Sequence, residues 1–207
     1  MIWSAVRTVV QRVDERFRVL PSSKPVERLP RRLHLGAGGI RVRGWCNVDI
    51  DPGTRPDVVD DVLTLSAFPA GHAEAIYACH VLEHLAHAEV PHVLARWREV
   101  LGPGGELRIS VPDLDRIVRV YCANWDHFHD DRNEPWIGLI YGGQTDEFDF
   151  HKTGFNFVYL RRLLREAGFA DISEYAHVPH FLGIQDSSLA NTPFGQYISL
   201  NVRATRL

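Results

Sequence analysis

Three ionisable side chains, His80, Glu83 and His84, lie within a five-residue stretch of the sequence. On a helix, side chains at these spacings share one face. Imidazole and carboxylate groups gathered in this way act as acids and bases or as ligands of a metal ion. A simpler alternative is that Glu83 and His84 orient one another and line a ligand pocket.

A second group of polar side chains follows two glycines near position 142. Gln144, Asp149, His151 and Lys152 offer hydrogen-bonding groups, and an imidazole with an ordinary pKa near 6.5 can act as a general base. Aromatic residues are frequent around this segment, and stacking rings flanked by polar groups suit a polyhydroxylated ligand. The segment therefore predicts a saccharide site, with an ordinary surface loop as the alternative.

The turn Gly36–Gly39 and the acidic residue Asp49 form the third candidate site. Each directly follows a short apolar run that is typical of a strand. Glycines let the backbone approach a ligand closely, and a carboxylate can accept hydrogen bonds from two ribose hydroxyls. The pair indicates a nucleoside cofactor, although a glycine turn also occurs without any ligand.

Strands and helices alternate along the first half of the chain. Strands are expected at 32–35, 46–50, 75–79 and 106–111, and a helix at 90–101 that ends at Gly102 and Pro103. This alternation predicts an α/β fold with a doubly wound, mostly parallel sheet. Ligands of such sheets bind beyond the carboxyl ends of the strands, where the three candidate sites lie.

The remaining segments suggest the domain organisation. Residues 1–30 are expected to form an amphipathic helix and a linker, and residues 31–207 one domain with an aromatic-rich cap at about 121–158. A helix at 159–167 and strands at 172–176 and 197–204 complete the domain. The N-terminal helix would pack on the domain or on a second subunit in a homodimer, or alternatively on a membrane surface.

The segment from Leu33 to Asp115 resembles the class I S-adenosylmethionine-dependent methyltransferases. Five motifs match in order and spacing: Leu35–Gly38, Val48–Pro52, Asp61–Val62, Val81–Leu85 and Val100–Gly105. The resemblance implies a seven-stranded Rossmann-like sheet whose last strand is antiparallel. Together with His80, the expected S-adenosylmethionine-binding residues are Gly36, Ala37, Gly38, Asp49, Ile50, Asp61 and Val62.

Two other enzyme classes fit the motifs less well. A dinucleotide-binding turn needs glycine at the sixth motif position, which is Arg41, and an acidic residue about 20 positions later. Only ten residues separate Gly38 from Asp49, which leaves hardly any room for a first helix. His-x-x-Glu-His also occurs in a group of zinc peptidases, but not in the context of a parallel sheet.

Some methyltransferases of this fold that act on hydroxyls hold a divalent cation through acidic and histidine side chains, which Glu83 and His84 resemble. A magnesium-like ion at Glu83 and His84 is therefore expected, beside the alternative that both residues only line the pocket. Asp113, at the end of the next strand, would add an oxygen ligand, and the histidines leave the identity of the metal open. The resemblance also places Glu83 and His84 in catalysis, and the imidazole of His151 is the candidate base. Asp113, Gln144, Asp149 and Lys152 are the expected acceptor-binding residues.

Composition excludes several other roles. A net charge of -3 gives no basic field for nucleic acid. Three cysteines without close pairing indicate a reducing cytoplasm, and no apolar run is long enough to span a bilayer.

Since Gly142–Gly154 resembles small methyltransferases of polysaccharide assembly, we expect O-methylation of a sugar hydroxyl in a saccharide or glycan precursor. The alternatives are another small-molecule hydroxyl or amine as acceptor, or a non-catalytic cofactor-binding scaffold.

Overall fold

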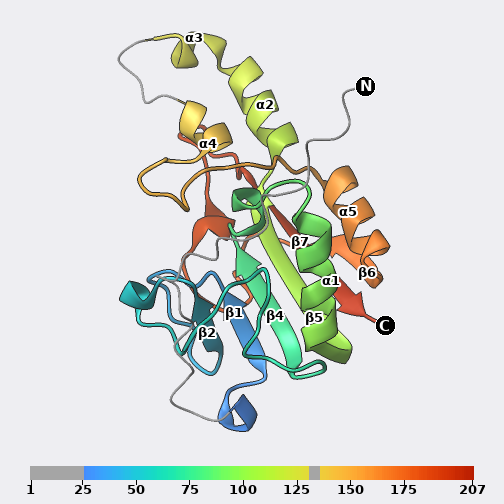
Figure 1. Ribbon diagram of the computed structural model, residues 1–207. Coiled ribbons are helices and arrows are strands. Elements are labelled where there is room, and N and C mark those ends of the chain that lie inside the picture. Colours follow the sequence, from blue (N-terminus) through green and yellow to red (C-terminus); the bar gives the residue numbers. More distant parts are fainter. Residues whose placement is uncertain (1–25, 131–135) are drawn as a thin grey trace, which may run out of the picture.

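A computed structural model describes residues 26–130 and 136–207, which contain one seven-stranded sheet (Figure 1). The strands are β1 (Arg32–Leu35), β2 (Cys46–Asp49), β3 (Val58–Val59), β4 (Ala73–Cys79), β5 (Leu101–Pro112), β6 (Phe169–Glu174) and β7 (Ser199–Arg206). Their order is β3-β2-β1-β4-β5-β7-β6, and only β7 runs antiparallel to its neighbours. The predicted mostly parallel sheet with an antiparallel last strand is confirmed.

Helices α1 (Val90–Val100) and α5 (Phe157–Glu166) cover one face of the sheet and lie side by side (Figure 1). Their apolar residues recur at spacings of three and four, so each helix buries one stripe. Trp97 of α1 and Leu164 of α5 are fully buried in the same core cluster as Ile76 of β4. The core therefore holds the carboxyl ends of β1, β4 and β5 in fixed positions.

Loops, not helices, cover the other face around Tyr77. The chain between Gly38 and Asp49 contains no helix, as the short spacing predicts. Val42 and Trp45 from that loop pack against the buried Tyr77 together with Phe181 from the connection between β6 and β7. Side chains of β4 alternate between the two faces, which places Tyr77 opposite Ile76.

Three short helices gather beyond the carboxyl end of β5 (Figure 1). They are α2 (Leu114–Ala123), α3 (Trp125–Phe128) and α4 (Ile137–Tyr141). The chain then returns to the sheet, where Leu114 N donates a hydrogen bond to Phe155 O at 2.8 Å. The aromatic-rich segment predicted as a cap thus begins within α2 and ends at α5.

The predicted N-terminal amphipathic helix falls on residues that lie outside the described part of the chain. Val26–Arg28 forms a single 3-10 turn, η2, and Leu29 packs into the core. Among residues 26–130 and 136–207, no helix combines the length and apolar character needed to cross a membrane.

Candidate active site

A cavity of about 310 Å³ opens where β1, β2 and β4 end. Its lining includes six of the eight residues that the sequence assigns to the cofactor: Gly36, Asp49, Ile50, Asp61, Val62 and His80. Ala37 and Gly38 are not in the lining but belong to the turn that shapes it. The strand ends therefore bring residues from four separate segments to one cavity.

Gly36 packs so closely against Val81 that no side chain fits at position 36. A Cβ atom there would lie 2.5 Å from Val81 Cγ2, and the φ angle of Gly36 is +60°. Gly38 also has a positive φ, +51°, but a Cβ atom there would meet nothing within 4 Å. Glycine is thus required at both positions for the left-handed backbone conformation, and at Gly36 also for close contact with the chain after β4.

Asp49, the last residue of β2, stabilises this turn through hydrogen bonds. Its Oδ2 accepts a hydrogen bond from Gly38 N at 2.7 Å, and its Oδ1 accepts one from Asp51 N at 2.9 Å. Each carboxylate oxygen has a second lone pair, and Asp49 lines the cavity. The carboxylate can therefore hold the glycine turn and still accept hydrogen bonds from ligand hydroxyls.

The turn at Asp61 and Val62 forms another wall of the cavity. Asp61 Oδ1 accepts a hydrogen bond from Leu63 N at 2.8 Å, and burial raises the pKa of Asp61 above its usual value. The buried Trp97 of α1 donates from Nε1 to Val62 O at 2.9 Å. A core tryptophan thus fixes the backbone of this cavity wall.

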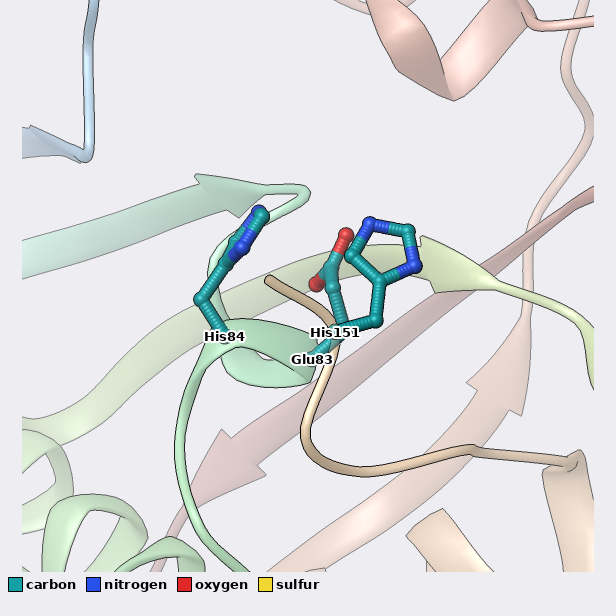
Figure 2. A group of neighbouring side chains, drawn as sticks. All are labelled: Glu83, His84 and His151. Carbon is teal, nitrogen blue, oxygen red and sulfur yellow. The ribbon is translucent and has the colours of Figure 1, made fainter. Parts of the chain in front are cut away.

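Glu83, His84 and His151 converge beside the cavity (Figure 2). Glu83 and His84 lie on a 3-10 turn, η4 (Leu82–His84), whereas His151 comes from the loop after α4. One ligand atom from each residue lies within 4.8 Å of those of the other two. The sequence predicts His80, Glu83 and His84 on one helix face. That expectation is wrong, because His80 follows the end of β4 in a left-handed conformation (φ 53°), Glu83 and His84 lie on the 3-10 turn, and α1 begins only at Val90.

The cluster contains buried polar atoms without hydrogen-bond partners. Glu83 is 1% exposed and neither carboxylate oxygen has a partner, nor does Nδ1 of His84. Burial raises the pKa of Glu83 to about 8. Burial lowers the pKa of His84 and of His151, and His151 lowers that of His84 further. Each group is thereby shifted toward its uncharged form.

His80 lies between Glu83 and β7. Its Nδ1 lies 3.2 Å from Glu83 Oε1, although the two atoms are not aligned for a hydrogen bond, and its Nε2 lies 2.9 Å from Ser199 Oγ. The Ser199 hydroxyl donates to Ser187 O at 2.7 Å, so Ser199 Oγ accepts from His80 Nε2. Burial, with smaller contributions from His151 and His84, lowers the pKa of His80 to about 4. His80 is therefore a neutral imidazole whose Nδ1 faces Glu83.

A second cavity, of about 270 Å³, adjoins the first. His151 and Lys152 line it, and Lys152 lines the first cavity as well. Its other walls are mostly apolar and come from α2 and α4: Leu114, Ile117, Leu139, Ile140 and Tyr141. The Glu83–His84–His151 cluster thus borders two cavities that meet at Lys152.

Comparison with known proteins identifies the family of this chain. A sequence family described as a methyltransferase domain matches residues 33–174. The chain belongs to the methyltransferase domain family. No curated protein matches the sequence.

Solved structures of methyltransferases share the fold of this methyltransferase domain. A SAM-dependent methyltransferase from Archaeoglobus fulgidus has 14% identity and a TM-score of 0.54, with 88% of each chain covered. One from Methanosarcina mazei has 16% identity and a TM-score of 0.55, covering 85% of this chain and 92% of that one. One from Thermotoga maritima has 16% identity and a TM-score of 0.54, covering 93% and 91%. The sheet is that of SAM-dependent methyltransferases.

Three other residues expected at the methyltransferase site lie outside both cavities. Gln144 is exposed, and Asp149 accepts hydrogen bonds from Thr145 N and Oγ1, which closes the loop after Gly142. Asp113 caps α2 and forms an ion pair with Arg116 at 2.8 Å. The structure groups Glu83 and His84 with His151 and not with Asp113. A metal ion bound by Asp113 stays a prediction.

Several lining residues were not anticipated from the sequence. Leu63, Val81, Leu85, Glu89 and Phe148 also line the first cavity, together with His84 and Lys152. Val81 and Leu85 are the two ends of the Val81–Leu85 motif and Glu89 lies four residues beyond it, so the motif itself was the available signal for these three. The sequence contains no signal for the apolar wall of the second cavity, because apolar side chains on a short helix are equally typical of an ordinary core or surface.

Proposed function

We propose that the protein is an S-adenosylmethionine-dependent O-methyltransferase that acts on a sugar hydroxyl of a saccharide or glycan precursor. The observation that carries this proposal is the pair of cavities that meet at Lys152. The first cavity has the glycine turn and the Asp49 carboxylate that suit the cofactor, and the second would receive the acceptor. We also propose a cytoplasmic location, which the small number of cysteines, three without close pairing in the sequence, supports.

Methyl transfer is an in-line displacement. The acceptor oxygen bonds to the methyl carbon as the carbon–sulfur bond breaks, S-adenosylhomocysteine leaves, and the hydroxyl proton passes to a base. The protein must align oxygen, carbon and sulfur and exclude water. His151 is suited to accept the proton because its lowered pKa keeps the imidazole neutral at pH 7 and because it lines the acceptor cavity.

A divalent cation beside Glu83 and His84 also belongs to this proposal. A sugar hydroxyl is almost wholly protonated at neutral pH, so it is a poor nucleophile. A cation in contact with its oxygen would lower the pKa of the hydroxyl and stabilise the developing alkoxide. Glu83 and His84 have buried, unpartnered ligand atoms that fit such an ion.

The lining of the second cavity supports a polyhydroxylated acceptor. Apolar side chains of α2 and α4 and the Tyr141 ring can contact the C–H faces of a sugar. His87, His151 and Lys152 supply polar groups along the same cavity. Few polar groups on a largely apolar wall are typical of a small-molecule site.

Methyl transfer from radiolabelled S-adenosylmethionine to a panel of acceptors tests the proposal. The panel should contain monosaccharides, oligosaccharides, phenols and aromatic amines at equal concentrations. We expect transfer to saccharides and release of S-adenosylhomocysteine, with the label stable to base as an ether. Faster methylation of phenols or amines would contradict the sugar assignment, and binding of S-adenosylmethionine without any transfer would favour a scaffold.

A further inference from the structure

We infer that Glu83, His84 and His151 form a binding site for a divalent first-row transition-metal ion, for which zinc is the probe of choice. This site differs in two ways from the magnesium-like site expected from the sequence. His151 is a third ligand, and the bound ion is one that prefers nitrogen ligands. Its role in catalysis rests on the proposed function, whereas the binding of the ion does not.

The three side chains are already close to the spacing that an ion needs. Their ligand atoms lie within 4.8 Å of one another, and the two imidazole ring centres are 5.1 Å apart at an angle of 74°. Tetrahedral bonds of about 2.0–2.1 Å place ligand atoms about 3.3 Å apart. Small side-chain rotations would close this difference. Figure 2 shows the three groups pointing toward a common region.

The unpartnered atoms need a ligand. A carboxylate that is 1% exposed, with no hydrogen bond to either oxygen, is costly in a folded protein, as is the buried Nδ1 of His84. A cation between them would satisfy both groups at once. Here the two groups adjoin a third potential ligand, His151.

Surrounding contacts hold the cluster in place, as they do around metal ligands in general. The backbone nitrogens of Lys152 and Thr153 donate to Glu83 O at 2.6 and 3.1 Å, which fixes the His151 loop to the turn that carries Glu83. The neutral His80 lies 3.2 Å from Glu83 Oε1 on the side toward β7. The ligand set is thus built on two segments that are tied directly to each other.

The donor atoms select the class of ion. Two imidazoles and one carboxylate match catalytic zinc sites and the iron sites of some oxygenases, which keep positions open for substrate. Magnesium instead prefers oxygen ligands in octahedral geometry. His151 lines the acceptor cavity, so an open position would be accessible to an acceptor oxygen. In the loaded site His151 would be a ligand instead of the base: the ion would lower the pKa of the bound hydroxyl, whose proton would pass to solvent as the oxygen bonds to the methyl carbon.

Calorimetric titration of the chelator-treated full chain with zinc, manganese or magnesium chloride tests this site. We expect one zinc per chain, with magnesium binding at least about 100-fold more weakly. Glu83→Gln, His84→Ala and His151→Ala should each weaken zinc binding at least about tenfold. Circular dichroism checks that each variant is folded. S-adenosylhomocysteine binding alone would not, because His84 lines the first cavity.

His87→Ala is the matched control, because His87 lines the same acceptor cavity but lies outside the cluster. Its zinc affinity should equal that of the unmodified chain. Absence of stoichiometric zinc binding, tighter magnesium binding, or equal losses in His87→Ala and His151→Ala would overturn the inference. Saccharide methylation by a chain that binds no metal would leave the proposed function standing, whereas zinc binding without any methyl transfer would leave only the site.

Discussion

The backbone nitrogen of Lys152 donates a 2.6 Å hydrogen bond to the backbone carbonyl of Glu83. This bond joins the loop that lines the acceptor cavity to the turn that borders the cofactor cavity. Thr153 strengthens the connection, because its Oγ1 donates to Leu85 O at 2.7 Å and lies 3.0 Å from His87 Nδ1. The two halves of the site are therefore expected to move as one unit.

Removal of the Thr153 hydroxyl should loosen this connection. Thr153 is 4% exposed, so Thr153→Val leaves Leu85 O without its partner and should lower the free energy of unfolding by about 1–2 kcal/mol. We expect kcat to fall while S-adenosylhomocysteine affinity changes little, since Thr153 does not line the cofactor cavity. Thr153→Ser retains the hydroxyl and should restore kcat. If both variants lose kcat equally, the hydrogen bond is not the cause.

The two glycines of the turn allow strain and steric clash to be separated. Gly36→Ala and Gly38→Ala both place a side chain at positive φ, but only the Cβ of position 36 meets Val81, at 2.5 Å. We expect about 1 kcal/mol of destabilisation from backbone strain in Gly38→Ala and a clearly larger loss in Gly36→Ala. Thermal unfolding and S-adenosylhomocysteine titration measure both effects.

The double variant Gly36→Ala/Val81→Ala provides the control for that comparison. Truncation of Val81 removes the clashing Cγ2 atom and should recover part of the stability that Gly36→Ala loses. Equal destabilisation by the two single alanine variants would show that contact with Val81 is unimportant.

Asp49→Ala should weaken S-adenosylhomocysteine binding about 10- to 100-fold, because a charged acceptor for ribose hydroxyls is lost. Asp49 also tethers Gly38 N, so the loss contains an indirect part. An analogue of S-adenosylhomocysteine without ribose hydroxyls separates the two parts in calorimetry. The unmodified protein should discriminate between the ligands and Asp49→Ala should not. Undiminished discrimination by the variant would exclude a ribose contact.

The sequence predicts the sheet well because local patterns determine it. Strand runs, the end of α1 just before Gly102, and the short spacing from Gly38 to Asp49 each act within a few residues, and the structure agrees with them. It differs in that β5 begins already at Leu101 and includes Gly102–Gly105, and in the additional short strand β3. The pairing of His151 with Glu83 depends instead on the path of the chain between β5 and α5, which has no local signature. Asp113 illustrates the converse: its place after a strand suggested a ligand, but capping of α2 and the charge of Arg116 engage its carboxylate.

The free energy of unfolding should depend on pH through Asp57, which contacts Asn47 of β2. Burial alone would raise the pKa of Asp57, but hydrogen bonds from Asn47 N and Nδ2, at 2.9 and 2.8 Å, and the charge of Arg41 lower it below its usual value. A carboxyl group whose pKa is lower in the folded state stabilises the fold above its unfolded pKa, and this contribution disappears as the pH falls through the folded pKa. Asp57→Asn should therefore cost about 1 kcal/mol at pH 7, since the group is partly exposed, and progressively less below about pH 4.

Urea unfolding of both proteins between pH 7 and pH 3 measures that difference. Arg41→Gln is the matched control, because it removes the Arg41 charge and the hydrogen bonds of the guanidinium to Asp57 Oδ1 and Arg55 O but keeps both hydrogen bonds from Asn47. Its cost at pH 7 should be smaller than that of Asp57→Asn and should decrease with added salt. A difference between the unmodified protein and Asp57→Asn that stays constant or grows toward pH 3 would contradict the assignment, because it would mean that the Asp57 charge does not stabilise the fold.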